Sequence, residues 1–400
     1  MLERLEMAPP DPIFGLTEAY KKDPNPRKIN LGVGVYQDET GKTPIFRAVK
    51  AAEKKLLEAE NNKSYLGIAG DPEFLESVQR LIYEGAEGLL RSGRLVTVQT
   101  AGGTGGVRVA ADFLKLAAPD AGVWISDPTW PNHPSILRAA GFEPKTYPYF
   151  DPGANELAFD VLLETLEAVP EGDIVLLHGC CHNPTGIDPT PEQWKALAEV
   201  MKRRGLVPLV DFAYQGLGEG WRQDVQGVLI LAEQLPEVLV ASSFSKNFGL
   251  YCERVGALTI IAESAERSAV ALSHVKRVIR SNYSNPPAHG ARIITTIVRD
   301  SELRQAWEEE VAAMRRRLAE TRKAFVQRLR ELGVERDFSY LERQKGMFSF
   351  SGLSRPQVER LREKYSIYIV GSGRINVAGI NPGNLDYLCE AIAEVVRELP

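Results

Sequence analysis

Residues 206–214 read LVPLVDFAY, a short apolar run that ends in an acidic residue followed by Phe-Ala-Tyr. The run has the length of a buried strand. The carboxylate of Asp211 at its end therefore needs a partner, because an isolated buried charge is very costly. An arginine or a helix N-terminus would be a structural partner, and the ring nitrogen of a bound cofactor would be a functional one.

Similar apolar runs lie on both sides of this stretch, with helix-like segments between them. The candidate strands are Leu95–Thr100, Val123–Ser126, Asp173–His178, Leu206–Asp211, Val238–Ser242 and Gly256–Ile261. The clearest helix opens at Thr190-Pro191-Glu192, with a capping threonine, proline at the first helical position and an acid in the first turn. This alternation predicts an α/β domain with a mostly parallel sheet flanked by helices.

A second, smaller domain is expected because 400 residues exceed what one hydrophobic core usually serves. From Ser301 to Gly333 the apolar residues follow helical spacing. This pattern predicts one long helix, broken or bent, that leads from the large domain into a smaller C-terminal one. An ordinary long surface helix fits the pattern nearly as well.

Composition narrows the class of protein. The chain has 48 basic and 53 acidic residues and a formal net charge of −5, which argues against a general nucleic-acid partner. No apolar stretch approaches the roughly 20 residues of a membrane-spanning helix, and the N-terminus lacks a signal or transit pattern. We therefore expect a cytoplasmic protein. Its four cysteines make no disulfide framework and suit a reducing compartment.

Polar residues gather where the candidate strands end. In open α/β sheets, ligands bind beyond the carboxyl ends of the strands. The four groups are Gly102-Gly103-Thr104-Gly105-Gly106, His182-Asn183-Pro184-Thr185-Gly186, Asp211-Phe212-Ala213-Tyr214 and Ser243-Phe244-Ser245-Lys246. Four such groups in succession indicate a single site.

The glycine-rich turn lies between a strand and a helix, where backbone N–H groups and the Thr104 hydroxyl can bind an anion. A dinucleotide fingerprint is excluded, since Arg108 stands three positions beyond Gly105. Such turns are more often structural than phosphate-binding.

Lys246 follows an apolar strand and two serines. A lysine at such an edge is usually a solvated surface charge. A desolvated lysine, however, can lose its proton and form a Schiff base with a carbonyl. Ser243, Ser245 and Arg254 could bind a phosphate beside it.

Cys180-Cys181-His182 invites a metal interpretation, which we reject because a zinc site needs further ligands at suitable spacing. No metal is expected. Two buried small residues under a site loop are the simpler interpretation.

With these residues in view, the chain resembles the aspartate aminotransferases and their aromatic relatives, the class I aminotransferases of the pyridoxal-phosphate superfamily. The likeness covers nearly the whole chain, from Ala8 to the C-terminus. It is carried by NLGVGVY at 30–36, YLGI at 65–68, PTWPNH at 128–133, HGCCHNPTG at 178–186, DFAYQG at 211–216, SFSKN at 243–247, YSNPP at 283–287 and SGRINVAG at 372–379.

The resemblance implies the aspartate-aminotransferase-like architecture, pyridoxal-phosphate fold type I. Residues 1–12 would form an N-terminal arm, and residues 46–313 the large cofactor-binding domain. Residues 13–45 and 314–400 would form a small α+β domain. The active unit would be a homodimer with shared active sites.

The resemblance also assigns roles around pyridoxal 5'-phosphate. Lys246 looks like the Schiff-base lysine, Asp211 would keep the pyridine nitrogen protonated, and Tyr214 would bond the phenolic oxygen. Asn183 would share that oxygen, Trp130 and Ala213 would cover the two ring faces, and His133 and His178 would surround Asp211. The phosphate ligands would be Gly103, Thr104, Ser243, Ser245 and Arg254, joined by Tyr65 of the partner subunit.

For substrates, the resemblance implies amino acids and keto acids that react in turn by a ping-pong mechanism. Arg374 would grip the α-carboxylate and Arg280, from the partner, a side-chain carboxylate. Trp130 and Asn183 would also contact substrate, and Phe348, Val33 and Gly34 would form pocket walls. The paired arginines favour transamination between aspartate or glutamate and 2-oxoglutarate or oxaloacetate.

Several alternatives stay open. Gln37 and Ser64 lie near positions that vary between aspartate-preferring and aromatic-preferring members, so an aromatic aminotransferase of dual specificity is one alternative. A decarboxylase or lyase on the same fold is another. A ligand-sensing regulator would carry an added DNA-binding module, for which a first strand motif at about Asn30 leaves no room.

Gly102 stands where many relatives have serine, which removes one phosphate hydroxyl, and Cys252 stands where asparagine is common.

Overall fold

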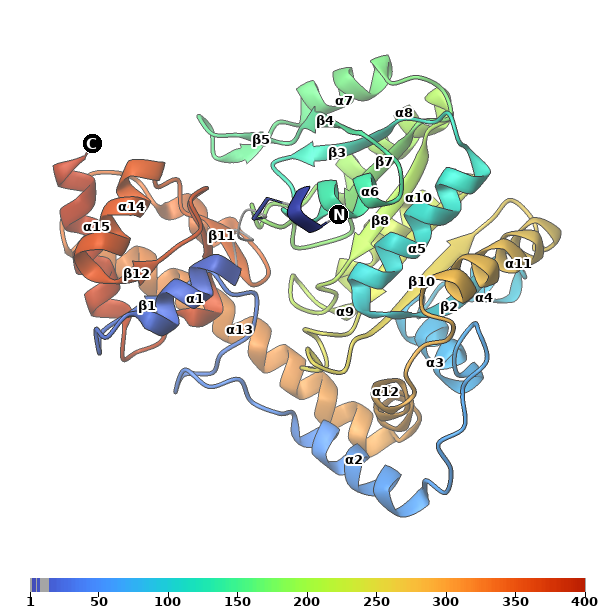
Figure 1. The fold of residues 1–400 in the computed structure, drawn as a ribbon. Helices are drawn as coiled ribbons and strands as arrows, with labels where there is room; N and C mark the ends of the chain where they lie inside the picture. Colours follow the sequence, from blue (N-terminus) through green and yellow to red (C-terminus); the bar gives the residue numbers. More distant parts are fainter. Residues whose placement is uncertain (1, 5, 8–13, 400) are drawn as a thin grey trace. The chain divides into compact units, whose positions relative to one another are not determined.

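The computed structural model describes residues 2–4, 6–7 and 14–399 (Figure 1). It divides into two compact units, Pro44–Arg316 and Met1–Thr43 with Arg317–Pro400. The domain boundaries expected from the sequence, after residues 45 and 313, stay a prediction of where the functional domains divide. The expected N-terminal arm, residues 1–12, falls largely outside the described residues.

The larger unit is built on a seven-stranded sheet in the order β2-β10-β9-β8-β7-β3-β4. The strands are β2 (Leu95–Ala101), β3 (Val123–Asp127), β4 (Pro144–Pro148), β7 (Ile174–His178), β8 (Val207–Phe212), β9 (Val238–Ser243) and β10 (Val255–Ile261). β10 is antiparallel to both of its neighbours, and the other pairs are parallel. The predicted α/β fold with a mostly parallel sheet is thereby confirmed.

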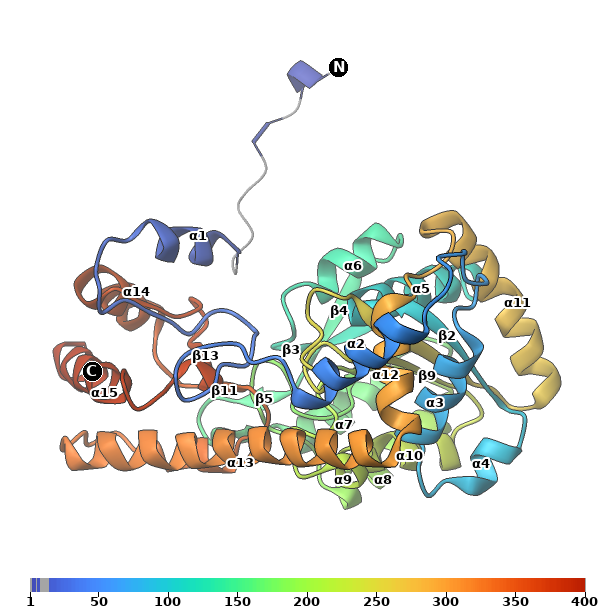
Figure 2. The same cartoon turned by 90° about the horizontal axis from the view of Figure 1, so that it is seen from below.

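Helices cover both faces of this sheet. They are α2 (Arg47–Ala59), α3 (Pro72–Ile82), α4 (Glu87–Arg91), α5 (Gly102–Ala117), α6 (His133–Ala139), α7 (Phe159–Ala168), α8 (Pro191–Arg204), α9 (Trp221–Asp224), α10 (Gln226–Gln234), α11 (Ala265–Asn282) and α12 (His289–Arg299). Figure 2 shows α5 and α11 on one face of the sheet and α8 and α10 on the other. A short hairpin of β5 (Phe150–Asp151) and β6 (Glu156–Leu157) completes the unit.

The predicted start of α8 is confirmed. The Thr190 hydroxyl accepts a hydrogen bond from the Gln193 backbone N–H at 3.2 Å, and the Gln193 side-chain oxygen accepts one from the Thr190 backbone N–H at 2.9 Å. Pro191 occupies the first turn, where its missing N–H costs nothing. The helix ends at Gly205, whose φ of +63° suits glycine.

One strand was missed. β4 reads Pro-Lys-Thr-Tyr-Pro, and its two prolines remove backbone donors that a central strand would need. The strand lies at the edge of the sheet, paired with β3 alone, so the missing donors face no neighbour. The sequence pattern therefore hid an edge strand.

The predicted long helix is α13 (Ser301–Glu331), which runs through the division at residues 316/317 without the break that was considered for it. Its apolar positions are buried, among them Trp307, Val311, Leu318 and Phe325. The helix therefore contributes core residues to both units, and the interpretation as an ordinary surface helix is wrong.

The smaller unit mixes helices with two small sheets. Its helices are α1 (Phe14–Lys22), α14 (Arg355–Tyr365), α15 (Leu385–Glu398) and the second half of α13, with 3₁₀ turns at Leu2–Arg4, Ser339–Arg343 and Val377–Gly379. β1 (Ile29–Asn30) pairs with β12 (Ile367–Tyr368), and β11 (Phe348–Phe350) with β13 (Arg374–Asn376). No helix in the described part of the chain has both the length and the apolar character needed to cross a bilayer.

Candidate active site

The parallel strands β7, β8 and β9 bring three of the predicted polar groups to one edge of the sheet. Their register pairs His178 with Asp211 and Phe212 with Ser242. The loops that follow these strands carry Asn183, Tyr214 and Lys246. The grouping predicted from strand ends therefore exists in space for these residues.

Lys246 lies partly buried just after β9, with its Nζ 4.8 Å from the centre of the Tyr214 ring. Burial disfavours the charged amine and lowers the pKa of Lys246 to about 8. The positive charge of Arg254 acts in the same direction, and the negative charge of Asp211 partly opposes it. The amine is therefore neutral far more often than an ordinary lysine, as a nucleophile must be.

Asp211 is the acid whose negative charge acts on this amine. Its side chain is 11% exposed, and Oδ2 lies 2.9 Å from Nε2 of His133. Burial alone would raise the pKa of Asp211, but the hydrogen bond from His133 and the charge of Lys246 outweigh it and hold that pKa below its usual value. Asp211 is thus a carboxylate at neutral pH, and its partner within the chain is a histidine.

A chain of hydrogen bonds continues from Asp211 through His133 and Thr129 to His178. Burial lowers the pKa of His178 to about 3, so its ring is neutral. The Asn183 backbone N–H donates to Nδ1 of His178 at 3.4 Å, which leaves the ring proton on Nε2. Nε2 then donates to the Thr129 hydroxyl at 3.1 Å, and that hydroxyl donates to Nδ1 of His133 at 2.8 Å. The remaining proton of His133 points at Asp211.

Thr129 had not been singled out from the sequence, although both histidines had. It bonds to His133 and also to His178, which lies 49 residues further along the chain, and the only local signal is its place four residues before His133. The neighbouring Trp130 meets His133 edge to face, with ring centres 5.2 Å apart.

The glycine-rich turn and the segment after β9 form a cradle for an anion. α5 begins at Gly102, so its first N–H groups and positive dipole end lie here. A Cβ on Gly103 would lie 2.8 Å from Cβ of Ser243, so only glycine permits this approach. The Ser243 hydroxyl contacts Ser245 Oγ at 3.3 Å, and Arg254 Nη1 donates to that Ser245 oxygen at 3.4 Å.

Gly102 adopts a backbone conformation and a close contact that favour glycine. Its φ is +70°, and a Cβ there would lie 2.5 Å from Nη2 of Arg254. A side chain at this position would therefore require the Arg254 guanidinium to move. Cys252, exposed two residues before Arg254, has no structural explanation.

Cys180 and Cys181 are buried, and their sulfur atoms lie within 4.8 Å of a carboxylate oxygen of Asp224. The two Asp224 oxygens already accept four backbone N–H groups, from Gly216, Gly218, Glu219 and Gly220. The carboxylate thus holds the loop that follows Tyr214. Burial also raises the pKa of the Cys180 thiol well above its usual value, which opposes metal binding.

The smaller unit holds the predicted α-carboxylate arginine. Arg374 in β13 is 1% exposed, and its Nη2 donates to the Gly32 carbonyl at 2.6 Å. Its guanidinium lies 4.2 Å from the centre of the Phe348 ring. A Cβ on Gly34 would lie 3.1 Å from Cζ of Phe348. Arg374, Phe348 and Gly34 are thus brought together.

Tyr65 and Arg280 lie outside the buried cluster around Lys246. Tyr65 is 91% exposed, and Arg280, at the end of α11, is exposed and donates to the Ser284 hydroxyl.

Together, a desolvated amine, an ionised acid and an anion cradle at one sheet edge define an enzyme that holds a phosphate-bearing carbonyl cofactor on a lysine. The residues fit pyridoxal phosphate: the Ser243 and Ser245 hydroxyls and the Arg254 guanidinium supply donors for a phosphate group, and Asp211 supplies the acid that the ring nitrogen requires.

Comparison with known proteins agrees with this class. Residues 26–392 match the model of the family "Aminotransferase class I and II". The chain is 52% identical to the aspartate aminotransferase of Salmonella typhi, over 99% of this chain and 100% of that protein. It is 47% identical to the aromatic-amino-acid aminotransferase of Pseudomonas aeruginosa, over 99% of both chains.

Solved structures give the same result. The aromatic-amino-acid aminotransferase of Burkholderia pseudomallei, covalently bound to pyridoxal phosphate, superposes with a TM-score of 0.96 at 49% identity, over 99% of both chains. The cytoplasmic aspartate aminotransferase of Saccharomyces cerevisiae gives 0.97 at 36% identity, over 100% of this chain and 99% of the other. The chain therefore belongs to the class I and II aminotransferase family. It is a pyridoxal-phosphate-dependent transferase.

Proposed function

We propose that the protein transfers an amino group between L-aspartate or L-glutamate and the keto acids 2-oxoglutarate or oxaloacetate. The observation that carries the proposal is the placement of Lys246 and Asp211 at the carboxyl ends of the neighbouring strands β8 and β9, where the amine has a pKa lowered to about 8 and the acid is held ionised by His133. A purely structural ion pair would not require the lysine to lose so much of its basicity.

Pyridoxal phosphate, when bound, supplies a ring that draws electrons away from the substrate α-carbon. Asp211 would hold the pyridine nitrogen protonated, and His133 would hold Asp211 in place. Tyr214 and Asn183 would bind the phenolic oxygen, and Trp130 would stack on the ring. The phosphate would lie among Gly103, Thr104, Ser243, Ser245 and Arg254, with Tyr65 of the partner subunit.

Lys246 would serve twice. Its neutral amine would hold the cofactor, and once displaced by the substrate the same amine would accept a proton from the substrate α-carbon. A pKa near 8 suits both tasks, because the group can accept and return a proton near neutral pH. The amino acid and the keto acid would bind to the same site one after the other, with the first product leaving before the second substrate binds. This order gives ping-pong kinetics.

Two arginines would bind the two carboxylates of the substrate. The Arg374 guanidinium donates to the Gly32 carbonyl and lies over the Phe348 ring, and its planar fork matches the geometry of an α-carboxylate. Arg280 would bind the second carboxylate from the partner subunit. The names of the most similar relatives support aspartate as the amino donor.

A second candidate is an aminotransferase that accepts aromatic as well as dicarboxylic amino acids. It is supported by similarity to aromatic aminotransferases at 47% and 49% identity. Under this alternative Arg280, which is exposed and donates a hydrogen bond to the nearby Ser284 hydroxyl, would swing aside for an aromatic side chain.

We propose a homodimer with shared sites as the active form, supported by the exposure of Tyr65 and Arg280 in the single chain. The cytoplasmic location expected from the sequence stays a prediction.

Steady-state kinetics test the proposal. Purified protein should turn over aspartate with 2-oxoglutarate, and should do so with parallel double-reciprocal lines. Phenylalanine in place of aspartate separates the two candidates. Absence of turnover with every dicarboxylic amino acid would remove the proposed substrate class.

A further inference from the structure

Gln99 links two segments that lie far apart in the chain. It is fully buried in β2. On one side its backbone N–H donates to the Ala69 carbonyl at 2.8 Å, and its side-chain oxygen accepts the Asp71 N–H at 3.2 Å. On the other side its amide nitrogen donates to the Pro287 carbonyl at 2.6 Å, and its own carbonyl accepts the Tyr283 hydroxyl at 3.2 Å. Every polar group of this residue is thus used between these two segments.

The two segments are the ones that carry Tyr65 and Arg280. The first, here called the Tyr65 segment, comprises residues 60–71, and the second, the Arg280 segment, residues 280–287. Gly70 has a φ of +108°, and a Cβ there would lie 2.3 Å from Cβ of Gln99. The close approach of the Tyr65 segment to β2 therefore depends on glycine.

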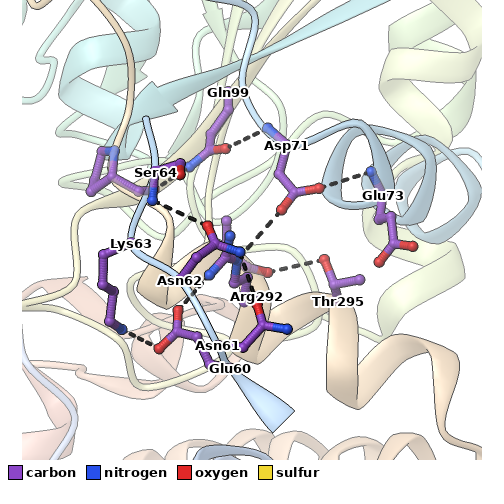
Figure 3. A network of polar contacts seen from close by, with 12 residues as sticks. Glu60, Asn61, Asn62, Lys63, Ser64, Asp71, Glu73, Gln99, Arg292 and Thr295 are labelled. Atoms are coloured by element: carbon purple, nitrogen blue, oxygen red, sulfur yellow. Dashed lines mark hydrogen bonds and ion pairs between the residues drawn. The ribbon is translucent and has the colours of Figure 1, made fainter. Parts of the chain in front are cut away.

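Arg292 makes a second link, and Figure 3 shows its place among the polar groups of the Tyr65 segment. It lies on α12, which follows the Arg280 segment directly. Its Nη1 pairs with Glu60 at the start of the Tyr65 segment, and its Nε lies 3.8 Å from Asp71 Oδ2 at the end. The Arg292 guanidinium therefore contacts both ends of the Tyr65 segment.

These ion pairs are better shielded from solvent than ordinary surface pairs. The side chains of Arg292, Glu60 and Asp71 are 24%, 16% and 16% exposed. Residues 61–65 between the two ends are all exposed. A flexible loop loses conformational entropy when it becomes ordered on binding a partner. Contacts that already hold the two ends of the loop in the free subunit make that loss smaller.

The geometry points to a brace, made of Gln99 and Arg292, that holds the Tyr65 and Arg280 segments at a fixed separation within one subunit. Its purpose is to present Tyr65 and Arg280 together to the active site of a second copy of this chain. Gln99 and Arg292 are positioning residues, since they act through Tyr65 and Arg280. The inference rests on the proposed function, in which those two residues serve the partner's site.

Arg292→Gln is the test variant, because Arg292 is partly exposed whereas loss of the buried Gln99 risks the fold. Arg299→Gln is the matched control. Arg299 lies on the same helix and pairs at 3.0 Å with Glu73 and Glu76 of α3, but it does not contact the Tyr65 segment. Arg292→Lys, which keeps the charge toward Glu60, should restore part of any loss.

Hybrid dimers locate the effect. In a hybrid of wild-type and Lys246→Ala/Arg292→Gln subunits, the only working lysine belongs to the wild-type subunit, which receives Tyr65 and Arg280 from the unbraced one. In a hybrid of Arg292→Gln and Lys246→Ala subunits, the working site receives them from a braced subunit. Tagged subunits allow each hybrid to be purified.

We expect the first hybrid to need roughly tenfold more aspartate for half-maximal rate, because misplacing a binding group by about 1 Å can cost up to about a hundredfold. Its requirement for added pyridoxal phosphate should rise as well. The second hybrid and all Arg299→Gln hybrids should match the wild-type/Lys246→Ala dimer. Equal effects in both hybrids, or none in either, would overturn the brace.

The same hybrids with Arg280→Ala in place of Arg292→Gln test the proposed sharing of sites by itself. If Arg280→Ala impairs only the site in its own subunit, the shared-site proposal fails and the brace fails with it. If it impairs only the partner's site while Arg292→Gln impairs neither, sharing stands and the brace alone is refuted.

Discussion

Replacing Asp211 with asparagine removes one negative charge while keeping the shape of the side chain. His133 can still donate its Nε2 proton to the amide oxygen, so the hydrogen bond at 2.9 Å and the local fold should survive. What is lost is the charge that would keep the pyridine nitrogen of the cofactor protonated. Without that proton the ring withdraws electrons weakly, and the rate should fall.

The size of the loss follows from burial. An exposed ion pair contributes about 0–1 kcal/mol, whereas breaking a buried pair costs about 3–5 kcal/mol. Asp211 is 11% exposed, so the buried range applies. Each 1.36 kcal/mol is a tenfold change in rate, and kcat should therefore fall by roughly two to four orders of magnitude.

The assay is steady-state turnover of aspartate with 2-oxoglutarate, with cofactor content measured by absorbance. Asp173→Asn is the matched control: Asp173 is 5% exposed and accepts hydrogen bonds from the Gly122 N–H and the Trp124 indole, but it precedes β7 at the opposite end of the sheet. It should lower stability and leave kcat nearly unchanged. Near-normal turnover of cofactor-loaded Asp211→Asn would remove Asp211 from the mechanism.

Three further predictions follow from the same site. Arg280→Ala should lower kcat/KM selectively for aspartate, by an amount that corresponds to about 3–5 kcal/mol of transition-state stabilisation if the ion pair between Arg280 and the substrate is desolvated. An equal loss of kcat/KM for phenylalanine would show that Arg280 does not select a second carboxylate. In the apoenzyme, Lys246→Met should raise the free energy of unfolding at pH 7 by about 2–3 kcal/mol, because burial depresses the lysine pKa to about 8 and folding therefore opposes its charge. That gain should shrink as pH rises from 8 and vanish above about 10.5, and a difference independent of pH in denaturant titrations would contradict it. Gly102→Ser should weaken cofactor binding instead of adding a useful hydroxyl, since its Cβ would lie 2.5 Å from Arg254 Nη2; tighter binding by titration of the apoenzyme would show that Arg254 moves aside.

Local sequence patterns predicted most strands of the sheet and the polar residues at the carboxyl ends of those strands. Buried parallel strands read as continuous apolar runs, so β7, β8 and β9 were visible, and with them the places of Asp211 and Lys246. The edge strand β4 was hidden because its two prolines break the pattern that central strands need.

Other parts of the site depend on contacts between distant segments, which no local pattern carries. Thr129 bonds to His178 across 49 residues. The proximity of Gly102 to Arg254 joins the start of α5 to the turn before β10. From the sequence alone, Gly102 was interpreted as the loss of one phosphate-binding hydroxyl. Only the structure shows that the Arg254 guanidinium lies where a side chain at residue 102 would be.

The most direct test of the account is to find which lysine carries the cofactor. The holoenzyme should be treated with borohydride, digested and mapped by mass spectrometry, with Lys246→Ala treated in parallel. The account predicts the reduced pyridoxyl phosphate label on Lys246 and no labelled peptide from the variant, which should fold but not turn over aspartate. A label on any other lysine of the wild-type protein would contradict the central claim.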